Sequence, residues 1–104
     1  MASPYTHADP AVREQRYRAA VKKAAELMLA GERVFSPIAH THEIGLLIDR
    51  PVDHDFWMQQ DFAVLRHCAK VVVLMLPGWM QSAGVGEEIE LARKLSIPVE
   101  YVEP

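Results

Sequence analysis

Two acidic side chains stand among apolar residues in segments that have helical spacing. At 100° per residue, Glu88 falls inside the arc that Val85, Ile89 and Ala92 form, and Asp61 lies among apolar positions of an earlier segment. A carboxylate that is partly desolvated near the positive end of a helix is suited to nucleophilic or proton-transfer work on a sugar. The alternatives are an acid that only favours the helix dipole, or one that pairs with a nearby Arg or Lys.

A glycine-rich string, Ser82-Ala83-Gly84-Val85-Gly86, directly precedes Glu88. Its glycines would let the backbone pass close to a sugar or phosphate bound at a helix N-terminus. The alternative is that Ser82 is a simple N-cap and the glycines serve the geometry of a turn.

Two histidines and two tryptophans are further candidates for ligand binding. His40 and His42 would project from the same side of an extended segment. We expect them to hydrogen-bond a ligand rather than hold a metal, because a zinc site needs about four ligands and no cysteine cluster or metalloprotease motif accompanies them. Trp57 and Trp79 could stack on a nucleobase, although packing is the commoner role of tryptophan. We expect neither a metal nor an organic cofactor.

The elements that must position these residues alternate between strand and helix. Helices are predicted over 10–30, capped by Asp9 and ended by Gly31, over 53–67 and over 87–96. Residues 1–4 are predicted to be the end of a first strand, and further strands are predicted over 33–36, 70–76 and 97–102. The segment 82–86 is predicted to be a turn. The segment 38–53 has weak periodicity, so an irregular loop with a short helical turn near 44–48 is predicted there.

This alternation predicts an α/β fold, a small doubly wound (Rossmann- or flavodoxin-like) parallel sheet of about four or five strands with helices on both faces. The 104 residues suffice for a single domain, 1–104. Ligands of such sheets bind beyond the carboxyl ends of the strands. The segments 3–7, 36–42 and 77–86 are therefore expected to share one rim.

Composition and charge argue against two kinds of partner, a nucleic acid polymer and a membrane. A formal charge of −3 gives no large basic field, so binding to a nucleic acid polymer is not expected. The longest apolar run, 71–76, is too short for a membrane span. The single cysteine, Cys68, cannot form an internal disulfide, and no signal peptide is recognised, so a cytoplasmic location is expected.

A string of residues in the second half of the chain resembles the nucleoside 2-deoxyribosyltransferase-like superfamily. It runs from Asp61 through Cys68-Ala69-Lys70-Val71-Val72-Val73 to Gly78-Trp79, Ser82, Gly84, Gly86 and Glu88-Ile89. The stretches Ala2-Ser3-Pro4-Tyr5-Thr6-His7 and Ser36-Pro37-Ile38-Ala39-His40-Thr41-His42 look like a compact branch of that superfamily. The most specific part, Ser-x-Gly-x-Gly-x-Glu opening a helix, is similar to the deoxynucleoside 5′-monophosphate N-glycosidases.

The resemblance implies roles for individual residues. Glu88 would be the nucleophile that forms a glycosyl-enzyme intermediate, Asp61 would orient the sugar or exchange protons with the base, and Tyr5 would supply a phenol at the rim. Ser82 stands where the transferases have an aspartate, which favours a 5′-phosphate that Arg13 or Arg16 could also bind. The residues expected to bind the substrate are Ser82, Gly84, Gly86, Ser3, His40, His42, Trp57, Trp79 and Arg16.

The expected function is therefore cleavage or transfer at the N-glycosidic bond of a nucleoside or nucleoside 5′-monophosphate, by a hydrolase or a transferase. Superfamily members commonly form dimers or larger assemblies, which implies a homodimer or higher homo-oligomer here. They also carry strand residues ahead of the Ala2 stretch, so a short first strand is expected. The short first strand motivates an alternative function, a non-catalytic nucleotide-binding or sensing module. A third possibility is a metal-dependent hydrolase that uses His40 and His42.

Overall fold

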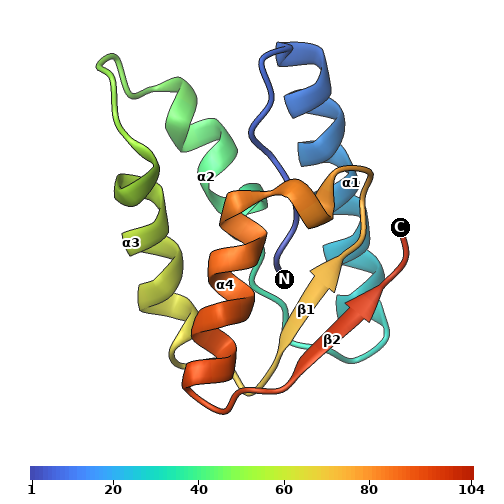
Figure 1. Ribbon diagram of the computed structural model, residues 1–104. Coiled ribbons are helices and arrows are strands. Elements are labelled where there is room, and N and C mark those ends of the chain that lie inside the picture. Colours follow the sequence, from blue (N-terminus) through green and yellow to red (C-terminus); the bar gives the residue numbers. More distant parts are fainter.

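The computed structural model describes residues 1–104 and contains four α-helices and two short parallel strands (Figure 1). None of the helices combines the length and the apolar character that crossing a membrane requires. In chain order the elements are α1 (Pro10–Leu29), α2 (Pro37–Leu46), α3 (His54–Leu65), β1 (Val71–Leu74), the 3₁₀ helix η1 (Trp79–Gln81), α4 (Ala83–Lys94) and β2 (Val99–Val102).

The first and third helices begin at aspartate N-caps. The Asp9 carboxylate accepts a hydrogen bond from the Ala11 amide, and the Asp53 carboxylate accepts one from the Phe56 amide. Each bond satisfies one amide that the first turn leaves unpaired. Gly31 follows α1 with a φ of 100°, a conformation that glycine adopts without strain. The helices predicted over 10–30 and 53–67 are confirmed to within about two residues at their ends.

The second helix, α2, corrects two predictions. Ser36 is its N-cap, with the hydroxyl accepting from the Ala39 amide at 3.3 Å, and Pro37 occupies the first turn. The strand predicted over 33–36 was therefore wrong. The irregular loop predicted over 38–53 was wrong for 38–46, which is helical, whereas 47–53 contains neither helix nor strand. The proline after Ser36 begins a helix instead of ending a strand, as proline at the first helical position can. The segment 33–36 belongs to neither strand of the sheet.

The sheet contains two strands, β1 and β2, paired in parallel with Val71 opposite Val99. The amino-terminal segment joins only through an isolated bridge between Ala2 and Val73. There the Leu74 amide donates to the Ala2 carbonyl at 2.8 Å. The predicted doubly wound sheet of four or five strands is therefore wrong, because the segments 1–4 and 33–36 do not pair over enough residues to become strands, and most of the regular structure is helical.

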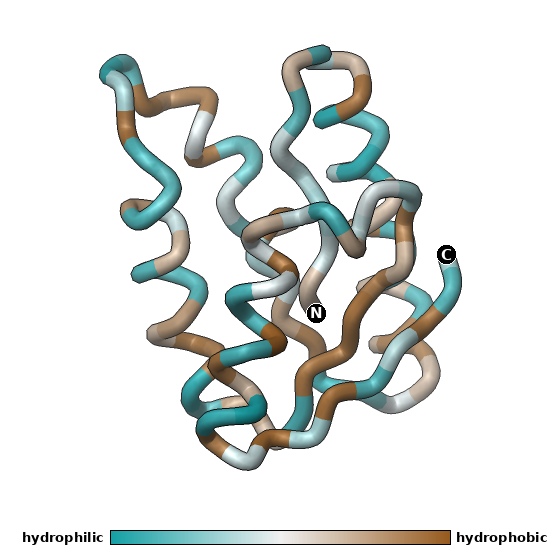
Figure 2. Tube along the Cα trace, viewed as in Figure 1, coloured by the Kyte–Doolittle hydropathy of each residue, from teal (hydrophilic) through white to brown (hydrophobic).

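The core lies where β1 meets α4. Leu74 is fully buried, and Figure 2 shows a continuous hydrophobic stretch along β1. Helix α4 covers one face of the strands, and α1 passes behind them in the view of Figure 1. Ala2, Leu65, Val71, Val73, Val85 and Ala92 form one buried cluster. This packing places the first turns of α4 beside the carboxyl end of β1.

Candidate functional site

A cavity of about 820 Å³ lies between the helices and the amino-terminal segment. Its walls come from residues 3–6, the early part of α1, α2, the middle of α3 and the start of α4 with the loop before it. The three segments 3–7, 36–42 and 77–86, which were expected to share a rim, each contribute residues to it. A volume in this range suits a small organic ligand of nucleotide size.

Glu88 projects from α4 into the cavity wall and is only 7% exposed. Val85 and Ala92, one turn away on either side, are buried as well, so the carboxyl sits on the apolar side of the helix, as its periodicity predicted. Burial, and second to it the negative charge of Asp61, raises the pKa of Glu88 from 4.5 to about 8. At neutral pH this carboxyl is held mostly in its protonated form.

Asp61 faces the same cavity from α3 and is half-buried. Desolvation raises its pKa from 3.8 to about 6, against the opposing effects of His40, the amino terminus and His54. The two carboxyls influence each other, so they titrate as a pair. Between about pH 6 and pH 8 the pair, Asp61 with Glu88, therefore carries a single proton.

The first turn of α4 and its N-cap line the same cavity as the two carboxyls. Ser82 is the N-cap, and its hydroxyl oxygen accepts from the Val85 amide at 3.2 Å, which leaves the hydroxyl proton free for a ligand. The helix begins at Ala83, so the glycine string predicted to be a turn is already helical. Gly84 lines the cavity, whereas Gly86 does not.

Two guanidinium groups stand at the cavity wall without a carboxylate partner. Arg16 donates to the carbonyls of Thr6 at 3.0 Å and Pro77 at 3.3 Å, and Arg13 donates to the carbonyl of His7. The ion pairs of the protein use other basic residues. Each guanidinium has five N–H donors, so both retain donors and an uncompensated positive charge for an anionic ligand.

Tyr5 and His42 lie at the side of the cavity beneath α1. The Tyr5 hydroxyl is 2.7 Å from Nδ1 of His42, and Nε2 of His42 is 3.1 Å from a carboxylate oxygen of Glu14. Tyr17 stacks on the imidazole with ring centroids 3.9 Å apart. Burial raises the pKa of Tyr5. Sequence reasoning missed Glu14 and Tyr17, although their spacing of three residues places them on one face of a helix.

The remaining predicted residues divide into two groups. Ser3 and Trp57 line the cavity, and the buried Ser3 hydroxyl has no hydrogen-bond partner in the protein. His40 does not line it but lies 5.3 Å from the Phe35 ring, because α2 is helical and residues two apart project in different directions. Trp79 is also outside, packed beside the core and beside Tyr101.

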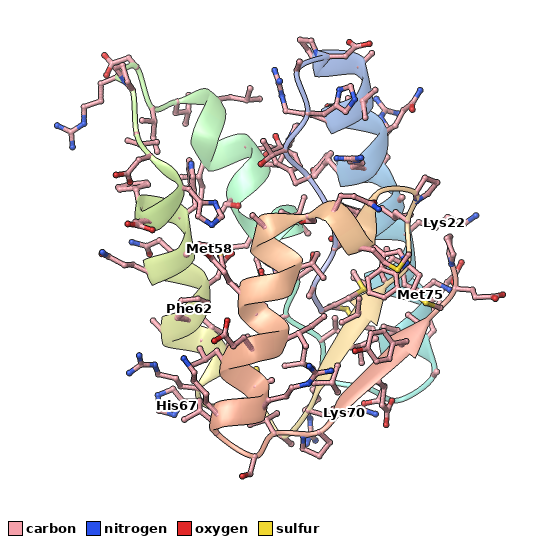
Figure 3. The ribbon with its side chains drawn as sticks, in the orientation of Figure 1. Lys22, Met58, Phe62, His67, Lys70 and Met75 are labelled. Atoms are coloured by element: carbon pink, nitrogen blue, oxygen red, sulfur yellow. The ribbon has the colours of Figure 1, made fainter.

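Several lining residues were not predicted. Met58 lies on the side of α3 that faces α4 (Figure 3), and its sulfur would be 3.8 Å from a Cβ added at Gly84. His54, at the start of α3, bonds a carboxylate oxygen of Glu87 at 2.7 Å and so joins α3 to α4 beside the cavity. The others are Thr6, Ile38, Thr41, Gly45, Leu46, Val52, Gly78, Gln81 and Ala83.

No three His, Cys, Asp or Glu side chains are grouped so that they could hold a metal ion.

A family model described as "Domain of unknown function (DUF1937)" matches residues 1–103. The chain belongs to the DUF1937 family. No curated protein matches it. The match contains every residue that lines the cavity, from Ser3 to Glu88.

Proposed function

We propose that the chain cleaves or transfers the glycosyl group at the N-glycosidic bond of a nucleoside 5′-monophosphate or nucleoside, with Glu88 as the nucleophile. The observation that carries this proposal is the pair of carboxyls, Glu88 and Asp61, that faces one cavity of about 820 Å³. Paired carboxyl groups across a sugar are the usual machinery of glycosyl transfer, because one attacks or stabilises the anomeric carbon and the other manages protons.

The single proton that the pair holds near neutral pH suits this reaction. The reactive state forms when the proton that rests on Glu88 moves to Asp61. The Glu88 carboxylate then attacks the anomeric carbon and forms a glycosyl ester, while the N-glycosidic bond breaks. The departing base takes its proton from the Asp61 carboxylic acid. Water then attacks the ester and releases the sugar in a hydrolase, or a second base does so in a transferase.

The charge of the cavity favours a phosphate on the substrate. Arg13 and Arg16 retain unpaired positive charge at the wall, and the Ser82 hydroxyl stands at the N-terminus of α4. The unpartnered Ser3 hydroxyl supports a polar ligand, since a buried hydroxyl without a partner costs about 1–3 kcal/mol that a ligand bond would recover. The Trp57 ring gives an apolar wall for the base.

The resemblance of the Ser82 to Glu88 string to the deoxynucleoside monophosphate N-glycosidases supports the same reaction. The two-stranded sheet is not the fold expected from that resemblance, so the proposal rests on the cavity and not on fold likeness. The unpaired thiol of Cys68 is compatible with our proposal of a cytoplasmic enzyme.

A second candidate function is a nucleotide-binding module without turnover. It is favoured by the raised pKa of Glu88, since a carboxyl that is mostly protonated at neutral pH is a poor nucleophile until the substrate changes its surroundings. This candidate predicts binding of a nucleotide without release of free base.

The test is incubation with a panel of nucleosides and 5′-monophosphates, followed by chromatography for free base. Glu88→Gln should lower turnover by roughly a thousandfold or more. Glu90→Gln is the matched control, because Glu90 lies on the exposed side of the same helix and pairs only with Lys94. Full turnover by the Glu88→Gln protein would refute the assignment of the nucleophile. Binding without any release of base would select the second candidate.

A further inference from the structure

A chain of three polar side chains leads from the cavity towards solvent. It begins at the Tyr5 hydroxyl, passes through both ring nitrogens of His42 and ends at the Glu14 carboxylate, with bonds of 2.7 and 3.1 Å. The imidazole is only 9% exposed, whereas Glu14 is 44% exposed. The chain therefore connects a group in the cavity wall with one that exchanges protons with water.

The partners of His42 fix which nitrogen carries the proton. A carboxylate only accepts hydrogen bonds, so the Nε2 that faces Glu14 must be the N–H donor. In a neutral imidazole Nδ1 is then bare and accepts the hydroxyl proton of Tyr5. With its proton directed at His42, the Tyr5 oxygen offers only lone pairs to the cavity.

We propose that Glu14, His42 and Tyr5 form a proton-transfer chain in which Tyr5 acts on an O–H group of the substrate or of the attacking water, and Glu14 and His42 are positioning residues behind it. This inference rests on the proposed function, since it assigns the acceptor of a proton in the same cavity. The proposed function uses only the carboxyl pair for proton transfer. This inference adds Tyr5 as a third group, with a path for its proton through His42.

The step balances within these residues. The O–H bond of the bound hydroxyl breaks and its proton moves to the Tyr5 oxygen, while the original proton of Tyr5 moves to Nδ1 of His42. The imidazolium that forms donates from Nε2 to the Glu14 carboxylate, whose negative charge stabilises it. Loss of the Nε2 proton through the half-exposed Glu14 leaves a neutral imidazole with its proton on Nδ1. The chain is restored when that proton returns through Tyr5 to a group in the cavity and Nε2 takes up a proton from Glu14.

The surroundings of the imidazole support a transient positive charge. Tyr17 stacks on one of its faces, and Tyr5 meets it edge-on with ring centroids 5.6 Å apart. The charged groups beside the chain are Arg18, which pairs with Glu14 at 3.0 Å, and Arg13, whose charge lowers the pKa of Tyr5 against the effect of burial. The aromatic faces therefore offset part of the repulsion from these arginines.

A double-mutant cycle tests whether His42 acts through Tyr5. Tyr5→Phe removes only the hydroxyl, and His42→Phe keeps a ring that can stack on Tyr17 while removing both nitrogens. Each variant should lower kcat/KM about a hundredfold, the lower end of a lost general base. The double variant should match Tyr5→Phe within about twofold, because the two residues act as one unit. His67→Phe, at an exposed histidine, is the control for the substitution.

The stage of the reaction that is slowed identifies the hydroxyl. Slower steady-state turnover after an unchanged first burst of free base would assign the chain to the attacking water, whereas a slower burst would assign it to a sugar hydroxyl. Either result supports the proposal. Effects that multiply in the double variant, or single variants within twofold of the unaltered protein, would overturn it.

A spectroscopic measurement decides the same point in the unaltered protein. The ¹⁵N chemical shifts of His42 at neutral pH should show a protonated Nε2 and a bare Nδ1, and Glu14→Gln should shift the balance between the two tautomers. A proton on Nδ1 would refute the chain. This readout needs no turnover, so a failure of the glycosidase proposal in the Glu88→Gln test is distinguishable from a failure of the chain.

Discussion

Replacing Glu88 by glutamine should stabilise the protein at alkaline pH and leave it almost unchanged in acid. Glutamine resembles the protonated carboxyl in shape but cannot ionise. In the unfolded chain the carboxyl ionises near pH 4.5, whereas in the folded protein burial raises its pKa to about 8. The unfolded state therefore binds fewer protons between these values, and the stability of the natural protein falls as pH rises from about 4.5 to about 8.

The size of the effect follows from that rise. At about 1.4 kcal/mol for each pKa unit, the rise from 4.5 to about 8 destabilises the folded protein at alkaline pH by at most about 5 kcal/mol. Part of the rise comes from the negative charge of Asp61, and the variant loses this repulsion together with the cost of burying the Glu88 charge. We expect Glu88→Gln to be more stable than the natural protein by roughly 2–5 kcal/mol at pH 9, and equal to it within about 0.5 kcal/mol at pH 4.

The measurement is urea unfolding followed by far-ultraviolet circular dichroism at several pH values, for the natural protein, Glu88→Gln and the exposed control Glu90→Gln. The slope of the transition should stay the same, so that midpoints report stability. Equal stability of Glu88→Gln and the natural protein at pH 9 would show that the carboxyl is hydrated in the folded state. The reasoning about the cavity would then fail.

Three further predictions concern the geometry around the site. Gly78→Ala should lower the free energy of unfolding by about 1–3 kcal/mol in urea titration, because φ at Gly78 is 91° and the new Cβ would lie 2.8 Å from a guanidinium nitrogen of Arg16. Gly86→Ala is the control: its new Cβ would meet no atom within 4 Å, so this variant should not be destabilised. Ser36→Ala should cost about 1 kcal/mol through loss of the α2 cap, seen as a lower Tm. If the proposed reaction occurs, kcat/KM should follow a bell-shaped pH profile with limbs near the pair's values of about 6 and 8, and a flat profile across this range would contradict the one-proton state.

Local signals sufficed to place helices α1 and α3 and the apolar side of α4, although not the start of α4. The cap at Asp9, the region of Asp53 and the apolar arc around Glu88 are each encoded within a few residues. The same signal at Ser36-Pro37 was interpreted as the end of a strand, although it has the cap-and-proline order of Asp9-Pro10. The difference is that Arg33 to Phe35 look strand-like, and nothing local shows that they lack a partner strand in the sheet.

Long-range features were the ones that the sequence did not disclose. The number of strands depends on pairing between distant segments, and Ala2 meets β1 at one bridge only. The Tyr5–His42–Glu14 chain joins residues up to 37 positions apart. Glu14 looks like an ordinary member of a polar helix face, as most acids there are. The projected position of His42 also depended on α2 being helical, which the sequence reasoning had not predicted.

The residues that line the cavity come from segments far apart in the sequence, so the site forms only when the chain folds. Ser3 and Glu88, which face the same space, are separated by most of the polypeptide, and α2 and α3 close the other side. A fragment that lacks either the amino-terminal segment or α4 cannot supply the whole of that wall. The chemistry of the protein should consequently appear and vanish together with its cooperative folding, without a smaller catalytic remnant.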